Sequence, residues 1–208
     1  MSTMVFMKGN EAIGEAAIRS GVMAYYGYPI TPQNELTAYM AKNMREKGRV
    51  FIQTESEITA INAVFGSCAG FRAMTSSAST AMSLKQEGIS HLAYLEIPAV
   101  IVDMMRGGPG LGNILATQND YNQAVKGGGT GDYHTIVLAP NSVQEAADLT
   151  RLAFELSDKY RNPAMILADG TIGQMVELVE FPEPIDPADI PERDYALTGN
   201  RGRAPRKA

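Results

Sequence analysis

Three kinds of reactive side chain follow apolar segments of this 208-residue chain. A threonine stands between two prolines in "GYPITPQNE" (27–35), two glutamates flank Ser56 in "TESE", and Arg106 precedes the glycine-rich "GGPGLGN". A hydroxyl on a stiff turn can orient a ligand, and a guanidinium can hold a carboxylate through two parallel hydrogen bonds. Together these groups indicate a ligand site, more strongly than any one motif does.

The backbone around Thr31 has little freedom, because Pro29 and Pro32 fix their own φ angles and disfavour helical geometry in the residue before each. The Thr31 hydroxyl is therefore presented in a defined direction. Two interpretations are open. Thr31 caps a helix that begins at Pro32, a favoured first helical residue, or the turn presents its hydroxyl to a ligand.

Arg106 and the glutamates also have a structural and a functional interpretation each. Arg106 either pairs with nearby Asp103 or holds the carboxylate of a ligand. Glu57 stands at the start of a predicted helix, where the helix dipole stabilises a carboxylate. Since Glu55 and Glu57 flank Ser56, one of them can face solvent and the other the site.

Other motifs are weaker signals. The segment "RGGPGLGN" is either a phosphate cradle or a mobile loop, and it lacks the lysine of a P-loop and the spacing of a dinucleotide fingerprint. "SSAST" (76–80) lacks the elbow of a serine hydrolase. The sequence contains no cluster of His and Cys residues, so it predicts no metal site. "GGGTGDYHT" (127–135) is a flexible loop, a lid or a partner contact.

Strand-like and helical segments alternate along the chain, and these elements must position the candidate residues. The strands are predicted at 22–27, 49–53, 71–76, 98–105, 134–140 and 163–169. The helices are predicted at 10–20, 32–47, 56–69, about 80–87 or beyond, and 142–160. The alternation indicates an α/β fold with a doubly wound, mostly parallel sheet. Because ligands bind beyond the carboxyl ends of parallel strands, all the candidate segments are expected along one edge.

Composition excludes several classes of protein. A net charge of −5 and a pI near 5.1 argue against nucleic-acid binding. The apolar stretches are too short to span a membrane. The single Cys68 can form neither an internal disulfide nor an iron–sulfur site, and the start lacks a signal peptide, so a cytoplasmic protein is expected. Residues 1–180 are predicted to form one domain. Residues 181–208, with five of the 11 prolines, are predicted to form a linker or tail.

The motifs together resemble the α subunit of 2-oxoacid:ferredoxin oxidoreductases, and most of all the branched-chain (2-oxoisovalerate, or 3-methyl-2-oxobutanoate) type. The resemblance runs from about residue 8 to 177. It rests on "GYPITPQNE", "TESEITAINAVFGSCAGFRAMTSSAST", "LKQEGIS", "VIVDMMRGGPGLGN", "GGGTGDYHTIVLAP" and "DKYRNPAMILADG". It implies that residues 1–180 are the pyrimidine-binding domain of a thiamine-diphosphate enzyme and that 181–208 begin the connection to a second domain.

The resemblance also implies roles for particular residues. In this family the glutamate that opens the helix after the second strand hydrogen-bonds N1′ of the cofactor's aminopyrimidine, and motif position assigns this to Glu57, with Glu55 as the alternative. The family's threonine and arginine hold the substrate, which assigns substrate binding to Thr31 and Arg106. Tyr28 and Pro29 of the same turn are expected to contact the cofactor.

The implied reaction is oxidative decarboxylation of a branched-chain 2-oxo acid to acyl-CoA and CO₂, with ferredoxin as electron acceptor. The chain lacks the ligands of an iron–sulfur cluster and the family's Mg-diphosphate motif. The resemblance therefore implies that a β subunit binds Mg and the diphosphate of thiamine diphosphate. It also implies that a further, ferredoxin-like subunit carries the iron–sulfur clusters. Three alternatives are open: a 2-oxoglutarate enzyme, in which Arg72 or Lys85 binds the second carboxylate, a non-catalytic scaffold subunit, and a nucleotide-binding protein.

Overall fold

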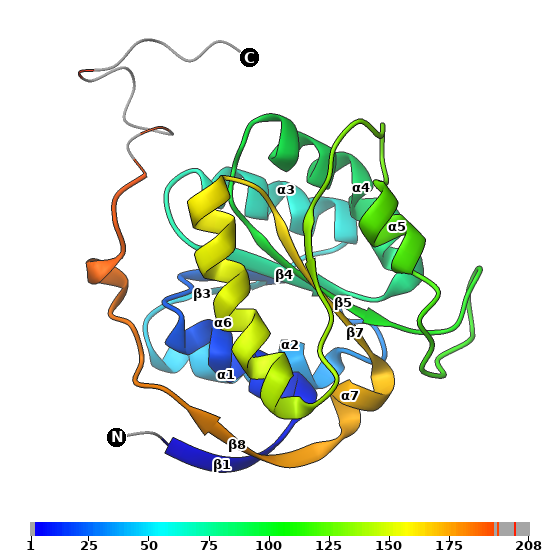
Figure 1. Ribbon diagram of the computed structural model, residues 1–208, viewed down its shortest axis with the longest axis horizontal. Helices are drawn as coiled ribbons and strands as arrows, with labels where there is room; N and C mark the ends of the chain where they lie inside the picture. The colour runs from blue at the N-terminus through cyan, green and yellow to red at the C-terminus, as the bar shows by residue number, and fades with distance from the viewer. Residues whose placement is uncertain (1–2, 194, 196–201, 203–208) are drawn as a thin grey trace.

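A six-stranded sheet forms the centre of the computed structural model, which describes residues 3–193, 195 and 202 (Figure 1). Its strand order is β3-β2-β4-β5-β7-β6, and every pair of neighbours is parallel. The strands are β2 (Ala24–Gly27), β3 (Val50–Gln53), β4 (Ala73–Ser77), β5 (Val100–Met105), β6 (Ile136–Leu138) and β7 (Ala164–Asp169). The predicted fold class is therefore confirmed.

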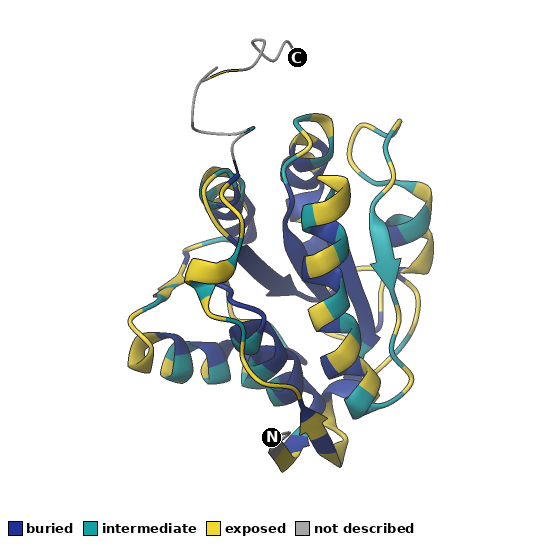
Figure 2. Cartoon of the chain, turned by 60° about the vertical axis from the view of Figure 1, so that its left-hand side comes forward, coloured by how far each residue is buried: buried dark blue, intermediate teal, exposed yellow. Residues whose placement is uncertain are grey.

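Helices cover both faces of this sheet (Figure 1). One face packs against α1 (Gly9–Arg19), α2 (Asn34–Glu46), α6 (Val143–Tyr160) and α7 (Gly170–Gln174). The other face packs against α3 (Glu57–Cys68), α4 (Ser79–Tyr94) and α5 (Tyr121–Lys126). Since β4 and β5 lie between the two layers, all of their residues are buried, and Figure 2 shows them as a dark core. This two-sided burial explains the unbroken apolar run that begins β5.

The sequence prediction missed a second, two-stranded sheet. β1 (Thr3–Lys8) pairs antiparallel with β8 (Val176–Phe181), so that Phe6 lies opposite Leu178. The partner of each strand lies at the other end of the described chain, so local periodicity could not reveal the pair. The short helices α5 and α7 and the 3₁₀ turn at Pro187–Asp189 were missed for a similar reason: none is long enough to show a helical period.

The segment after β8 lies against the domain as far as it is described. The Ile185 amide donates to the Arg19 carbonyl at 2.7 Å, and the Arg193 guanidinium bonds Asp158 at 2.6 Å and the Phe71 carbonyl at 2.8 Å. Most of residues 194–208 fall outside the described residues, so the assignment of 181–208 as a linker or tail stays a prediction. Among the helices that the structure describes, none is long and apolar enough to cross a membrane.

Close packing of α3 on α4 depends on a glycine. A Cβ atom on Gly88 would lie 2.6 Å from the Ile61 side chain, a distance that real Cβ atoms do not show. Because Gly88 has no side chain, α4 can lie close to α3. The buried side chains on the facing sides of the two helices are thereby brought close together.

Candidate active site at the carboxyl edge of the sheet

The candidate segments leave neighbouring strands at one edge of the sheet, as expected. Thr31 follows β2, Glu57 begins α3 after β3, Ser79 begins α4 after β4, and Arg106 follows β5. The strand order puts β2 and β4 side by side and β5 next to β4, so the turns after these strands meet.

Three side chains from separate parts of the chain hold the turn that contains Thr31. The Gln33 amide donates to the Tyr28 carbonyl at 3.0 Å, the Asn10 amide to the Pro32 carbonyl at 2.9 Å, and Arg106 Nη1 to the Thr31 carbonyl at 2.9 Å. The turn is thus fixed by tertiary contacts as well as by its prolines. Within it Tyr28 and Thr31 are partly buried and Pro29 is exposed.

The capping interpretation of Thr31 is wrong. Helix α2 begins at Asn34 with Gln33 in the N-cap position, two residues later than predicted. The Thr31 hydroxyl instead accepts a weak hydrogen bond, 3.3 Å, from the Asn34 side chain. Because no backbone amide of the helix needs this hydroxyl, it remains able to orient a ligand.

Gln33, which the sequence analysis overlooked, lies in a buried polar network beneath the turn. Its Oε1 accepts hydrogen bonds from Ser76 at 2.5 Å and Thr37 at 2.8 Å, and the Tyr25 hydroxyl contacts both of those hydroxyls. Gln33 and Tyr25 are fully buried. The place of Gln33 directly after Pro32, at the start of the predicted helix, was the one available signal.

Replacing Gln33 by methionine should therefore destabilise the domain and loosen the turn. We expect the free energy of unfolding to fall by about 3 kcal/mol, since buried polar groups lose their partner. Urea unfolding of the purified chain measures this. The exposed Gln53 gives a matched control, because Gln53→Met should change stability by less than about 0.5 kcal/mol. An equal effect of both substitutions would contradict the role of Gln33.

Arg106 does not pair with Asp103, so that structural interpretation is wrong. Its guanidinium donates to the Thr31 carbonyl and, at 3.3 Å, to the Thr80 hydroxyl. Its Nε atom is buried and has no hydrogen-bond partner within the described residues. A buried donor without a partner is costly, so this side chain can accept a ligand at that position.

The backbone of Arg106 is held by Ser79. The Ser79 hydroxyl contacts the Arg106 amide at 2.9 Å, the Arg106 carbonyl at 2.8 Å and the Asp120 carboxylate, and the Ser79 amide donates to Asp103 at 3.2 Å. Burial, and secondarily the charge of Asp120, raises the pKa of Asp103 well above its usual value. Neither His91 nor His134 bonds to Ser79 in the part of the chain that the structure describes, so the geometry gives no hydrolase triad.

Glu57 and Glu55 have different surroundings. Glu57 is buried, with 8% of its surface exposed, at the first position of α3. Its carboxylate makes no hydrogen bond or direct ion pair with any described residue, including Thr31 and Arg106. Glu55 is exposed and accepts hydrogen bonds from Thr59 and, at 3.1 Å, from Ser56; these bonds, that of Thr59 above all, lower the pKa of Glu55. Of the two acids, Glu57 has the free capacity to accept.

The two cations considered for a second substrate carboxylate lie elsewhere. Arg72 precedes β4, at the opposite edge of the sheet, and bonds Asp158 at 2.7 Å and the Ser20 carbonyl at 2.5 Å. Lys85 is fully buried in α4 and donates to the Thr75 hydroxyl at 2.9 Å. Neither is available to a substrate at the edge that carries Thr31 and Arg106.

Burial lowers the pKa of Lys85 to about 7 from its ordinary 10.5, and the charge of Glu57 opposes this decrease. Between about pH 7 and pH 10.5, the unfolded chain binds more protons at Lys85 than the folded chain does. The free energy of unfolding should therefore rise with pH. The increase is at most about 1.4 kcal/mol per pH unit. Denaturant unfolding of the chain and of Lys85→Met from pH 7 to 9 measures it. Parallel stability curves for the two proteins would contradict it.

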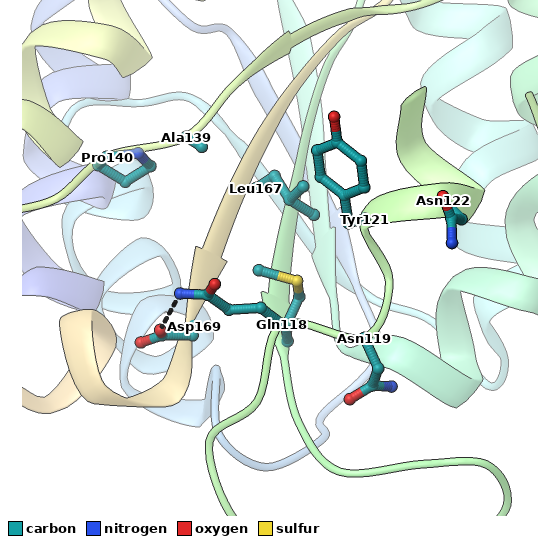
Figure 3. Close-up of a pocket in the computed structure, with 9 residues that line it drawn as sticks. Gln118, Asn119, Tyr121, Asn122, Ala139, Pro140, Leu167 and Asp169 are labelled. Carbon is teal, nitrogen blue, oxygen red and sulfur yellow. Dashed lines mark hydrogen bonds between the residues drawn. The ribbon is translucent and has the colours of Figure 1, made fainter. Parts of the chain in front are cut away.

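Two pockets open at the same edge of the sheet. One, of about 450 Å³, lies beside the ends of β5 and β7; Figure 3 shows Gln118 donating to Asp169 across it, at 3.3 Å. A second, of about 390 Å³, includes Ser79, Thr80 and Asp120. Neither is lined by Thr31, Glu57 or Arg106, so these three side chains are not enclosed in either pocket of this chain.

The glycine-rich loops differ in their packing. Residues 108–113 are exposed. The loop then turns back, and the backbones of Arg106 and Ala116 form an isolated antiparallel β-bridge. The loop of 127–135 lies on α4, where Tyr133 donates to Gln86 at 3.2 Å. Its roles as lid or partner contact stay predictions.

Among the described residues no group of three or more His, Cys, Asp or Glu could hold a metal ion.

Residues 15–201 match the protein family described as pyruvate flavodoxin/ferredoxin oxidoreductase, thiamine diphosphate-binding. The ketoisovalerate oxidoreductase subunit VorB of Methanothermobacter marburgensis is 56% identical over 94% of this chain and 55% of its own length. The 2-oxoglutarate synthase subunit KorA of Methanocaldococcus jannaschii is 43% identical over 87% of this chain and 50% of its own. The chain thus spans about half the length of these relatives.

A solved structure agrees with these sequence matches. The 2-oxoglutarate:ferredoxin oxidoreductase from Magnetococcus marinus, with 2-oxoglutarate, coenzyme A and succinyl-CoA bound, superposes with a TM-score of 0.81 at 33% identity. The superposition covers 90% of this chain and 32% of that one. This chain therefore belongs to the thiamine diphosphate-binding family of pyruvate flavodoxin/ferredoxin oxidoreductases.

Proposed function

We propose that this chain is the α-type subunit of an oxidoreductase that converts branched-chain 2-oxo acids, such as 2-oxoisovalerate, to acyl-CoA and CO₂ with ferredoxin as electron acceptor. One observation carries the proposal. Arg106 bonds the Thr31 turn while keeping a buried Nε donor free, on the same edge where Glu57 is buried without a hydrogen-bond partner among the described residues.

The residues present fit thiamine diphosphate. When bound, this cofactor supplies the carbon nucleophile that attacks the 2-oxo group and retains the electrons when CO₂ leaves. A carboxylate without a described hydrogen-bond partner, on a residue that is otherwise buried, suits a ring nitrogen that shares a proton, and Glu57 is such a residue. We assign the neighbouring cofactor contacts to Tyr28 and Pro29, which form the same turn as Thr31.

Each side chain has a separate task in this proposal. Glu57 holds and releases a proton at the cofactor's ring nitrogen, and this interaction is strong where the bound cofactor excludes water. The Arg106 guanidinium binds the substrate carboxylate. The Thr31 hydroxyl orients the substrate, and the bonds from Gln33, Asn10 and Arg106 keep the turn in place, because orientation requires rigidity.

Partner chains complete the site in this proposal. The three candidate side chains lie at an edge rather than inside either described pocket, which suits a site shared between subunits. We assign the diphosphate and Mg to a β subunit and the iron–sulfur clusters to a ferredoxin-like subunit. Residues 1–180 are then the pyrimidine-binding domain, and 181–208 the connection to a further domain.

The branched-chain substrate is supported by two observations. The VorB relatives are 54–56% identical to this chain, whereas the KorA relatives named for 2-oxoglutarate are 40–43% identical. Of the two cations considered for a second carboxylate, Arg72 is bonded to Asp158 at the opposite edge of the sheet, and Lys85 is fully buried and bonded to Thr75.

Oxoacid-dependent viologen reduction by the co-purified complex tests the function. We expect kcat/KM for 2-oxoisovalerate to exceed that for 2-oxoglutarate by at least about tenfold, since neither Arg72 nor Lys85 can pair with a second substrate carboxylate. A higher value for 2-oxoglutarate would overturn the substrate assignment. No activity with any 2-oxo acid, in a complex that holds its cofactor and clusters, would support the scaffold alternative instead.

A further inference from the structure

Asp120 is a buried acid that the reaction described above does not use. It immediately precedes α5, and 8% of its surface is exposed. One of its carboxyl oxygens contacts the Ser79 hydroxyl, and the other accepts a hydrogen bond from the Asn119 side chain at 3.4 Å. Burial raises the pKa of Asp120, and the hydrogen bond with Ser79 opposes this increase. A buried acid is costly unless it is neutral or well bonded, so its protonation depends on what Ser79 offers.

The Ser79 hydroxyl makes three close contacts but has a single proton. The Arg106 amide donates to Ser79 Oγ at 2.9 Å, the Arg106 carbonyl lies 2.8 Å from the same atom, and Asp120 contacts it as well. A hydroxyl donates one hydrogen bond and accepts two. The Arg106 carbonyl and an ionised Asp120 would therefore compete for the one Ser79 proton. All three contacts are hydrogen bonds only if Asp120 carries a proton and donates it to Ser79 Oγ.

Ser79 and its neighbour Thr80 hold both parts of Arg106. Ser79 bonds the Arg106 backbone, and the Thr80 hydroxyl accepts a hydrogen bond from Arg106 Nη2 at 3.3 Å. The backbone of Ser79 has a φ of 24°, in a region that residues other than glycine rarely adopt. Such a conformation persists only where its surroundings fix it, and the Ser79 amide is bonded to Asp103 at 3.2 Å. The start of α4 therefore has a definite geometry around Arg106.

We propose that Asp120 is a positioning residue for Arg106: as a neutral carboxylic acid it donates to Ser79, whose own proton is thereby directed to the Arg106 carbonyl. This inference rests on the proposed function, in which Arg106 binds the substrate carboxylate. A neutral acid also suits this place electrostatically. An ionised Asp120 would add a negative charge near Arg106 and weaken its attraction for an anion. The protonated acid supplies a donor without that charge.

Steady-state viologen reduction by the assembled complex with 2-oxoisovalerate tests this role. Asp120→Ala should raise KM about tenfold and leave kcat within about twofold, because a buried hydrogen bond that orients Arg106 is lost. Asp120→Asn should keep KM within about twofold, since its side-chain amide can donate to Ser79 and its oxygen can still accept. Asp148→Ala, at an exposed aspartate of α6, is the matched control. Equal losses in Asp120→Asn and Asp120→Ala, or an unchanged KM in Asp120→Ala, would overturn the proposal.

A double-mutant cycle measures whether Asp120 acts through Ser79. Ser79→Gly removes the hydroxyl, and glycine adopts a positive φ without strain, so the chain should still fold. Once the hydroxyl is absent, the further change Asp120→Ala should alter KM by less than about twofold. Full additivity of the two substitutions would mean that Asp120 acts by another route, and the proposal would fail.

A third measurement needs no substrate. In the 208-residue chain, NMR gives the rate at which the Arg106 backbone amide exchanges its hydrogen with solvent, relative to the amides of β5. Asp120→Ala should speed this exchange by about tenfold, and Asp120→Asn should leave it near the wild-type rate. A relative rate that Asp120→Ala does not change would overturn the positioning role even if the complex is active. A wild-type complex that turns over no 2-oxo acid, with the exchange rate changed as expected, would overturn the proposed function while supporting the positioning of Arg106.

Discussion

Glu57→Gln should abolish turnover of the assembled complex, lowering kcat by roughly 10²- to 10⁴-fold. Glutamine has nearly the same shape as glutamate and still accepts a hydrogen bond, so the first turn of α3 should persist. It cannot hold or release the proton that the cofactor's ring nitrogen requires. Viologen reduction measures the loss of turnover, and NMR of hydrogen–deuterium exchange at the thiazolium carbon measures whether activation of the cofactor itself has been lost.

The matched control is Glu55→Gln, two residues away. Glu55 is exposed and bonded to Ser56 and Thr59, so its replacement should leave both turnover and exchange close to wild-type values. Co-purification of the partner subunits with each variant checks that assembly is unaffected. Wild-type turnover in Glu57→Gln, or an equal loss in both variants, would refute the assignment of Glu57.

Arg106→Ala should raise KM for the 2-oxo acid by around 10²-fold, corresponding to a loss of about 2–3 kcal/mol of charged hydrogen bonding. The guanidinium is expected to bind the substrate carboxylate, and it also holds the Thr31 carbonyl at 2.9 Å. Both effects weaken binding of the substrate more than they slow the chemical steps. Steady-state kinetics at saturating coenzyme A separates KM from kcat.

Two further variants sharpen this test. Arg106→Lys keeps the charge but not the planar fork of donors, so it should recover only part of the affinity. Arg151→Ala removes a half-exposed arginine of α6 that pairs with Glu155 on the surface, and KM should not change. An unchanged KM in Arg106→Ala, or full recovery by lysine, would contradict bidentate binding of the carboxylate.

The amino-acid sequence by itself determined the order and type of the main elements. Apolar, β-branched runs such as "PAVIVDMM" indicate strands buried on both faces, and the alternation with helical periods leads to a parallel sheet. The predicted start of a helix at residue 142 was confirmed, since Ser142 is the N-cap of α6 and its hydroxyl accepts from the Glu145 amide at 3.1 Å. These features depend on neighbours within a few residues. They also placed Thr31, Glu57 and Arg106 at the ends of strands.

Only the tertiary structure decided which side chains meet. The pairing of β1 with β8, the bond from Arg106 to the Thr31 turn, and the bond from Asn10 to the Pro32 carbonyl all join residues that are far apart in the chain. Such contacts follow from strand order, which brings β2, β4 and β5 together, and from the rotation of each helix against the sheet. Local sequence does not encode either quantity. For the same reason, only the fold showed that Glu57 is buried while Glu55 is exposed.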